Sequence, residues 1–394
     1  MTTAVLLLIA LATASSGAGK GKGHRMRSSY VIGYTEYRTN LPGGRHVNAW
    51  TMRACTVRGD GTGRRVLAEG LARKPHTWTQ SAGWSPDGRQ AIVCNGWESP
   101  ENGAWEEEHQ GFRFAPEGWL LDTCLLDVAR GGIVNLTAVD RVSHYNSGLF
   151  FWPGNPRKLG FTALIGGESR PFSMDLDGRN KRDLSQGPGF TYGYSASPDG
   201  RRIAYHKDYQ VYVADADGSH ATHVETGQPF NLAPQWSPDG EMLLFLAGEH
   251  YNCHPYVVRR DGTGLRKLAD RRGWEGVTPV FDVPDHHGGS SDTPVWSADG
   301  AWVYYTARIG ESVELMRVSL EGREEQLTHS RPGSLTYHPK PSPDGEWLAF
   351  GSNQTGTRQL YVARPDGTDA RPITNVVPGS GAMWAYWRPV MSKR

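Results

Sequence analysis

The stretch Trp236-Ser237-Pro238-Asp239-Gly240, followed by the apolar run EMLLFLA, decides the fold of this chain. In Ser-Pro-Asp-Gly, proline at the second place and glycine at the fourth favour a tight turn, and the apolar run after it is typical of a strand. The phrase returns along the chain, intact or altered. Its other copies are Trp84–Gly88, Ser197–Gly200, Trp296–Gly300, Ser342–Gly345 and Trp152–Asn155. A hairpin that recurs in this way predicts a repeat architecture.

The interval between the copies identifies the repeat. The turns begin at residues 85, 152, 197, 237, 297 and 342, and three of the intervals are 40 to 45 residues long. The repeats also hold a second turn of the Asp-Gly kind, such as RDGTG at 260–264, so that four strands fit between successive copies. Four strands at this spacing are typical of a β-propeller blade.

The two ends of the chain supply a seventh blade. Residues 29–70 hold three strands with no strand before them, and residues 382–390 (AMWAYWRPV) hold one strand with no blade after it. Pairing these segments leaves no open sheet edge between the first and last blades. We therefore predict an all-β, seven-bladed β-propeller, with its ring closed by the C-terminal strand completing the N-terminal blade.

The predicted blades leave a short N-terminal segment outside the propeller. Residues 4–12 are apolar but too few to span a bilayer as a helix, and Ala12-Thr13-Ala14 fits a signal-cleavage site. We interpret residues 1–14 as a signal peptide and 15–28 as a flexible tail, and expect a single propeller over 29–390. The expected blades are 29–70 with 382–390, 77–137, 143–185, 191–226, 232–269, 292–328 and 335–374.

Charge and cysteine content narrow the function. The 394 residues carry 42 basic and 41 acidic side chains, and this balance gives no electrostatic basis for nucleic-acid binding. We expect a periplasmic or secreted monomer with no transmembrane segment in the mature protein. The four cysteines include no C-x-x-C pair, so no zinc knuckle is indicated. Cys94 and Cys124 are expected on neighbouring strands, either as a disulfide or as buried thiols.

The connections between strands divide the propeller into two faces. The short Ser-Pro-Asp-Gly and Asp-Gly turns belong to one face, and two long insertions, 96–118 and 270–291, belong to the other. Histidine follows the insertions: of the 14 histidines, His220 and His223 map to a turn of the first face and His24 to the tail, whereas the others map to the second face. Loops on a rigid scaffold often carry function, and imidazole is a common metal ligand and base. The second face is therefore the predicted functional face.

Four histidines of this face are predicted to converge at the mouth of the central channel. His250 and His254 come from one loop, His287 comes from the crossing that follows, and His338 begins the innermost strand of the last blade. Together they can hold a divalent metal such as Mn, Ca or Zn, with Asp285, Asp292 or water completing the set. The remaining candidate site residues are Tyr192, Tyr251, Asn252, Trp384 and Arg358 for ligand binding, and His144 and Arg308 for catalysis.

The Trp-Ser-Pro-Asp-Gly repeats, each followed by an apolar strand, resemble the WD-like propeller repeats of the TolB family and of propellers attached to prolyl oligopeptidases. The resemblance covers about residues 75–390. It implies a propeller fold and says little about function. The peptidase alternative is set aside because no G-x-S-x-G motif occurs in the sequence.

A weaker resemblance is to the oligogalacturonate lyases, which are exported seven-bladed propellers with a divalent metal. Their Gln-x-His-x-His pattern precedes a late Ser-Pro-Asp-Gly turn and corresponds here to Ser334–His338. Only His338 keeps the family's residue, because Ser334 and Thr336 stand at the other two places. The resemblance implies β-elimination on uronates, in which a histidine takes the proton beside the carboxylate and a metal or an arginine, Arg308 or Arg358, neutralises that carboxylate.

Three functional hypotheses remain open at this point. The first is an exported binding propeller that recognises an oligo- or polysaccharide or an envelope protein at its histidine-rich channel mouth. The second is a metal-assisted carbohydrate lyase. The third is hydrolytic chemistry on a pair of carboxylates. The carboxylates considered for that pair are Glu106, Glu107, Glu108, Glu249 and Asp285.

Overall fold

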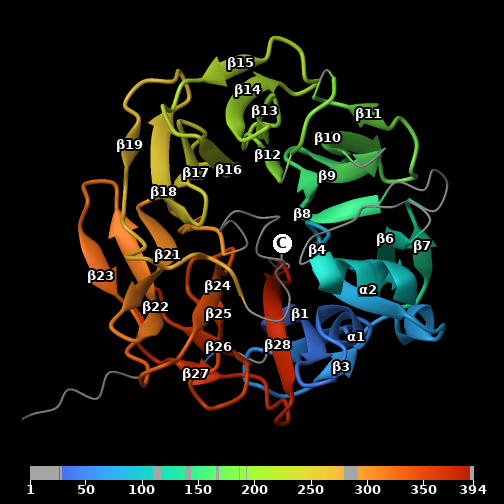
Figure 1. Cartoon of the computed structure of the whole chain (residues 1–394). Coiled ribbons are helices and arrows are strands. Elements are labelled where there is room, and N and C mark those ends of the chain that lie inside the picture. Colours follow the sequence, from blue (N-terminus) through green and yellow to red (C-terminus); the bar gives the residue numbers. More distant parts are fainter. Residues whose placement is uncertain are drawn as a thin grey trace, which may run out of the picture.

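Seven four-stranded antiparallel sheets form a ring in the computed structural model of the chain, as Figure 1 shows. The structure describes residue 26 and residues 29–109, 118–137, 143–165, 168–185, 187–191, 193–278 and 292–390. In each sheet the first strand lies toward the centre of the ring and the fourth lies at its rim (Figure 1). The predicted seven-bladed β-propeller is confirmed.

Each sheet is built from consecutive strands, except for the one that joins the two ends of the chain. From the centre outward, the closing sheet consists of β28 (Ser380–Trp387), β1 (Val31–Arg38), β2 (Arg53–Arg58) and β3 (Arg65–Val66). The next three sheets, in the same outward order, are β4 (Thr77–Trp84), β5 (Gln90–Glu98), β6 (Trp119–Asp127) and β7 (Ile133–Asn135); β8 (Ser143–Trp152), β9 (Asn155–Ile165), β10 (Glu168–Asp175) and β11 (Arg182–Asp183); and β12 (Tyr194–Ala196), β13 (Arg202–Lys207), β14 (Gln210–Asp215) and β15 (Thr222–Val224). The last three sheets are β16 (Phe230–Trp236), β17 (Met242–Glu249), β18 (Asn252–Arg259) and β19 (Arg266–Lys267); β20 (Val295–Trp296), β21 (Trp302–Ile309), β22 (Ser312–Ser319) and β23 (Glu324–Gln326); and β24 (Thr336–Pro341), β25 (Leu348–Ser352), β26 (Gln359–Ala363) and β27 (Arg371–Pro372).

The helices of the described residues are short and lie in connections between strands. α1 (Arg45–Ala49) lies between β1 and β2, α2 (Pro100–His109) lies between β5 and β6, and the 3-10 helix η1 (Glu69–Ala72) lies between β3 and β4. Within the described ranges, none of these helices is long and apolar enough to cross a membrane.

The closing sheet pairs strands from opposite ends of the chain. β28 runs antiparallel to β1, with Ile32 opposite Trp387, and the Arg388 amide donates to the Val31 carbonyl at 2.9 Å. Met26 is also buried here, in one cluster with Ile32 and Trp387. The C-terminal strand therefore completes the N-terminal blade, as the sequence predicts.

Hydrogen bonds within the repeated turn explain its sequence. The Gly240 amide donates to the Ser237 carbonyl at 2.9 Å, and Gly240 has a φ of 73°, which residues with a side chain rarely adopt. The Ser237 hydroxyl donates to the Asp239 carboxylate at 2.5 Å and accepts the Met242 amide at 2.9 Å, while Asp239 accepts the Glu241 amide at 3.0 Å. The serine bonds recur in the copies that begin at Ser85, Ser197, Ser297 and Ser342.

Tryptophan at the end of an innermost strand ties adjacent sheets together. The Trp84 indole donates to the Tyr386 carbonyl at 3.0 Å, and the Trp387 indole donates to the Lys340 carbonyl at 2.8 Å. These bonds link the closing sheet to its neighbours on both sides. The aromatic residue before the turn therefore contributes to the ring and not only to its own hairpin.

The hydrophobic core is divided among the interfaces between adjacent sheets. One cluster, for example, joins Leu244 and Val257 of one sheet to Val303 of the next. Cys94 and Cys124 are buried free thiols, and burial raises the pKa of each to about 12. Of the two alternatives that the sequence left open for these cysteines, the structure has the thiols.

Deleting residues 382–394 is expected to remove the folded state. The deletion takes away β28 and exposes both the inner edge of β1 and the apolar cluster around Ile32, so the ring opens. Circular dichroism during thermal unfolding measures the result. A truncated protein with the melting temperature of the intact chain would contradict the role of the closure.

Replacing Asp239 with alanine is expected to lower the free energy of unfolding by about 1 kcal/mol, because the turn loses its carboxylate hydrogen bonds. The Ser237 hydroxyl and the Glu241 amide hold the pKa of Asp239 below its ordinary value. The stabilisation is therefore present at neutral pH and lost as the pH falls through that lowered pKa. Urea unfolding at neutral and acid pH tests both statements. Glu241→Ala, in the same turn, is the control.

Candidate binding site on the b–c face

The two ends of each sheet carry different connections. With strands called a to d from the centre outward, the a–b and c–d turns lie at one end, and the b–c loops and the crossings to the next sheet lie at the other, which we call the b–c face. α1 and α2 both belong to this face. Among the described histidines, those on the b–c face or the strand ends beside it are His46, His76, His109, His144, His206, His250, His254, His329 and His338. His220 lies in the c–d turn between β14 and β15, as expected, whereas His223 lies on β15 with its Nε2 3.3 Å from Gln210, the first residue of β14.

Several innermost strands carry an unusual backbone conformation at the same place. Non-glycine residues with a positive φ occur at Ala233 (50°), His338 (52°) and Trp384 (57°), and each coincides with an irregularity in strand pairing. Ala233 and His338 stand four residues before the serine that begins the a–b turn, as does Gly193, with a φ of 74°, and Trp384 stands at the equivalent place on the closing strand. The left-handed backbone conformation costs roughly 1–2 kcal/mol for a residue other than glycine. Bulges of this kind redirect side chains and are frequent beside functional sites.

Two of these bulges bring aromatic side chains together. The rings of His338 on β24 and Trp384 on β28 are stacked, with centroids 6.4 Å apart. Both side chains are half-buried. The His338 amide donates to the Asp292 carboxylate at 2.8 Å, so the strained backbone has a buried anchor. The structure thus brings two predicted site residues from different sheets into ring contact.

Asp292 is the centre of a buried network that spans three sheets. It accepts hydrogen bonds from the Trp274 indole at 3.1 Å and from the Thr306 hydroxyl, and lies 3.6 Å from the Arg271 guanidinium. Arg271 and Asp292 are 1% and 2% exposed. An ion pair this deeply buried requires hydrogen bonds that satisfy both partners, which the network supplies. The sequence suggested Asp292 as a metal ligand, whereas the structure uses it to hold the His338 backbone.

His254 joins the same network from the other side. Its Nδ1 accepts the Arg271 amide at 3.2 Å, and its Nε2 lies 3.8 Å from Asp270. Burial and, secondarily, the charge of Lys267 lower the pKa of the His254 imidazole, and Asp270 opposes this effect. His254 is therefore a packed, neutral side chain that orients the crossing at Arg271.

His250 and Tyr251 lie in a row of rings that crosses two sheets. His250 is exposed and stacks on Phe230 at 4.9 Å, and Tyr251 lies 4.2 Å from His250. On its other side, Phe230 contacts Tyr209 at 4.8 Å. Asn252, a predicted ligand-binding residue, is exposed at the start of β18 beside this row.

The two candidate arginines have different surroundings. Arg358 is half-buried, with its guanidinium 5.9 Å from the ring centroid of Tyr337, and its Nη1 has no hydrogen-bond partner among the described residues. Arg308 is exposed, and its backbone amide donates to the Arg271 carbonyl at 3.0 Å. Arg358 therefore lies beside the Tyr337 ring, whereas Arg308 is exposed to solvent.

Three predicted site residues cannot be placed as side chains. Tyr192 and His287 lie outside the described residues, and His144 is described only as part of β8. In the described part of the chain, no group of three or more histidine, cysteine or acidic residues is arranged to hold a metal. His250, His254 and His338 thus do not form a metal site by themselves, and the four-histidine site stays a prediction.

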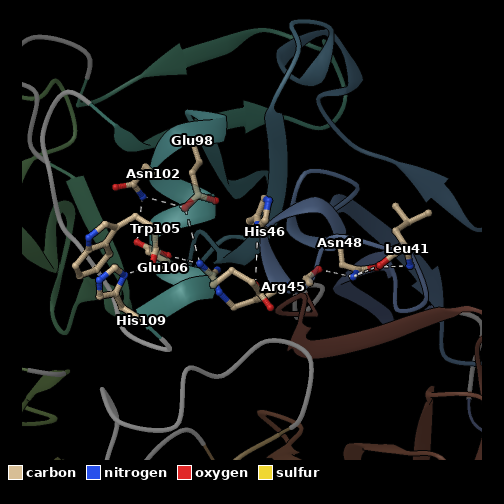
Figure 2. A network of polar contacts seen from close by, with 11 residues as sticks. Leu41, Arg45, His46, Asn48, Glu98, Asn102, Trp105, Glu106 and His109 are labelled. Atoms are coloured by element: carbon tan, nitrogen blue, oxygen red, sulfur yellow. Dashed lines mark hydrogen bonds and ion pairs between the residues drawn. The ribbon is translucent and has the colours of Figure 1, made fainter.

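A second polar network, shown in Figure 2, joins α1 to α2. Arg45 contacts the Glu106 carboxylate and lies 3.8 Å from Glu98, while the Asn102 amide donates to Glu98 at 3.0 Å and to Glu106 at 3.1 Å. Both carboxylates are buried, at 0% and 3% exposed. Glu107 accepts the Arg45 backbone amide at 2.9 Å. The network fixes the connections of two neighbouring sheets against each other.

Sequence reasoning missed both buried networks. Glu98, Asn102 and Glu106 are spaced four residues apart, which is the spacing of one helix face and a usable signal for part of the second network. Arg45 and Arg271 have no comparable signal, because their partners Glu106 and Asp292 are far from them in the sequence.

Comparison with known proteins supports a TolB-like propeller. No protein-family model matches the chain. The uncharacterized peptidase YuxL of Bacillus subtilis is 28% identical over 207 residues, which are 41% of this chain and 29% of that protein. The TolB homolog of Chlorobium luteolum is 30% identical over 154 residues, which are 39% of this chain and 31% of that protein. The chain thus resembles TolB-like proteins, as its repeats indicate, and the matches span less than a third of each relative's length.

The chain also resembles a solved oligogalacturonate lyase in complex with manganese. The two structures superpose with a TM-score of 0.55 at 14% identity, over 83% of this chain and 84% of the lyase. At this level of identity the likeness shows the shared propeller fold alone.

Replacing Arg45 with methionine is expected to destabilise the protein by about 3 to 5 kcal/mol, because Glu98 and Glu106 stay buried without their cation. The control is Arg179→Met, which removes the exposed ion pair with Asp177 and should cost at most about 1 kcal/mol. Urea unfolding compares the two variants. Equal losses would contradict the structural role of the α1–α2 network.

His254→Gln is expected to reduce the acid sensitivity of the fold. Because the folded-state pKa of His254 is lowered, the unfolded chain binds a proton more readily, and stability falls as the pH drops below the ordinary histidine value of about 6.5. Glutamine does not titrate and can still accept the Arg271 amide. The loss of unfolding free energy between pH 7 and pH 5 should therefore be smaller in the variant. His223→Gln, with its exposed imidazole, is the control.

Proposed function

We propose that this protein is an exported, monomeric TolB-like propeller that binds an oligo- or polysaccharide or an envelope protein on its b–c face, around His338 and Trp384. The observation that carries the proposal is the pair of left-handed bulges that hold these two rings in contact. Each bulge interrupts the pairing of its strand and redirects the side chain that it carries. Presenting these two rings to a ligand is the role that we assign to the bulges at His338 and Trp384.

The surroundings of the pair suit ligand binding. Arg358 supplies a half-buried guanidinium 5.9 Å from the ring centroid of Tyr337. The buried ion pair of Arg271 and Asp292 keeps the His338 backbone in place without using its imidazole. A rigid aromatic surface with a nearby donor is typical of binding sites for polymers and proteins. The signal-like segment 1–14 supports a periplasmic or secreted location.

The test compares the protein with Trp384→Asn, since asparagine tolerates the left-handed conformation better than most residues and the bulge should persist. Calorimetry with neutral oligosaccharides and oligogalacturonate, and cross-linking to periplasmic proteins, provide the two kinds of partner. A ligand or protein bound at least tenfold more tightly by the original protein supports the proposal. If no partner distinguishes the two proteins while both fold equally well, the proposed site is wrong.

The second candidate function is a metal-assisted lyase acting on uronates, and the observation that favours it is His338 at the last place of the lyase pattern. Ser334 and Thr336, at the other two places, are buried at 5% and 0% exposed and offer hydroxyl groups where the family has stronger metal ligands. His287, with His250 or His254, would have to replace them. Metal analysis of the purified protein, followed by ultraviolet detection of unsaturated products from oligogalacturonate, tests this candidate. Absence of both a bound metal and such products would exclude it.

A further inference from the structure

Six rings form a continuous row on the b–c face of the two sheets β12–β15 and β16–β19. The members of this aromatic row are Phe190, His206, Tyr209, Phe230, His250 and Tyr251. Consecutive ring centroids are 4.2 to 5.9 Å apart. His206 is buried and His250 is exposed, and the others are half-buried. The row therefore has a packed underside and a side that solvent reaches.

Two tyrosines of the row stand at equivalent places in adjacent sheets. Tyr209 is the second residue of the two-residue turn between β13 and β14, and Tyr251 is the second residue of the turn between β17 and β18. Their φ angles are 63° and 59°. Asparagine or glycine would relieve the cost of this conformation, which is roughly 1–2 kcal/mol for each tyrosine. The turns thus hold large aromatic residues where the backbone alone favours small ones.

The row is held rigidly from below. Tyr209 and Phe230 pack against the buried side chains of Leu232, Leu246 and Cys253. Two hydrogen bonds join the b–c turns to the neighbouring segments. The Asn231 side-chain amide donates to the Tyr209 carbonyl at 2.9 Å, and the Asp208 backbone amide donates to the Phe190 carbonyl at 2.9 Å. Rings fixed in this way lose little conformational entropy when a ligand covers them.

The polar groups beside the row define the chemistry of its ligand. Asp208, Glu249 and Asn252 are exposed; Asp208 and Asn252 each adjoin a tyrosine of the row, and Glu249 adjoins His250. Their oxygens and amide can bond to hydroxyl groups, while the rings offer flat apolar surface. Two carboxylates beside the row would repel an anionic chain such as a polyuronate. The combination fits a chain of neutral sugar rings, whose faces are apolar and whose edges carry hydroxyls.

We propose that the aromatic row is a binding platform for a neutral oligosaccharide, with Tyr209 and Tyr251 as its two main stacking residues. This inference rests on the proposed function and names the class of polymer and the sheets that receive it. The row lies on the b–c face of the sheets β12–β15 and β16–β19, which the sheet β20–β23 separates from the sheet that carries His338 (Figure 1).

The test uses Tyr209→Asn and Tyr251→Asn, which remove a ring while favouring the turn. A purely structural role predicts variants that are destabilised and bind normally. The platform predicts the opposite: unfolding free energy close to the original or higher for Tyr251→Asn, and a dissociation constant raised at least tenfold. Calorimetry with gluco-, manno- and N-acetylglucosamine hexaoses measures binding, and oligogalacturonate is the anionic comparison. His220→Ala, in the c–d turn between β14 and β15 on the opposite face, is the control and should leave the dissociation constant unchanged.

The remaining outcomes of these binding experiments each contradict the proposed binding platform. If no neutral hexaose binds the original protein, the platform is wrong, and binding of oligogalacturonate or of a protein in the Trp384 experiment would leave the proposed function standing. If a neutral hexaose binds but only Trp384→Asn weakens it, the ligand does not use the row. If neither experiment finds a partner, the inference and the proposed function fail together.

Discussion

The pairing of β28 with β1 is the interaction on which the rest of the structure depends. A four-stranded sheet cannot bury both of its faces alone, and each sheet here covers its apolar surface with the next one around the ring. Such an arrangement is complete only when the last sheet meets the first. The backbone bonds around Val31 and Trp387 make that contact with segments from opposite ends of the chain, so no sheet edge is left exposed between them.

Closure also explains how strained residues can persist at the centre of the ring. His338 and Trp384 lie on adjacent innermost strands that are held by their own sheets and by the neighbouring ones. The buried network around Arg271 and Asp292 links three sheets beside His338. Arg45 of α1 links the closing sheet to the sheet β4–β7 through its ion pair with Glu106 of α2. Rigid surroundings of this kind allow residues other than glycine to remain in the left-handed backbone conformation. The b–c face carries these buried ion pairs together with aromatic side chains. The opposite face carries short turns whose hydrogen bonds are formed within the turn itself.

The fold could be predicted because each hairpin is specified locally. Ser237, Asp239 and Gly240 bond to one another and to the amides that follow, and the same residues recur in sequence wherever the turn recurs. The side of the propeller that carries the histidines also follows from local spacing. The arrangement within the site does not. His254 reads as a metal ligand in the sequence, yet it is packed against the amide of Arg271, and Asp292 reads as a co-ligand, yet its oxygens are used by Trp274, Thr306, Arg271 and the His338 amide.

The sequence by itself determined the turns, the count of blades and the identity of the strand that closes the ring, since these depend on residues within a few positions of one another and on regular spacing. Tertiary structure alone decided which side chains meet. The stacking of His338 on Trp384, the row from Phe190 to Tyr251 and the ion pairs of Arg45 and Arg271 all join residues that are far apart in the sequence. Their contacts depend on the angle between neighbouring sheets and on residues with the left-handed backbone conformation in strands and turns. Neither of these features can be predicted from the spacing of residues along the chain.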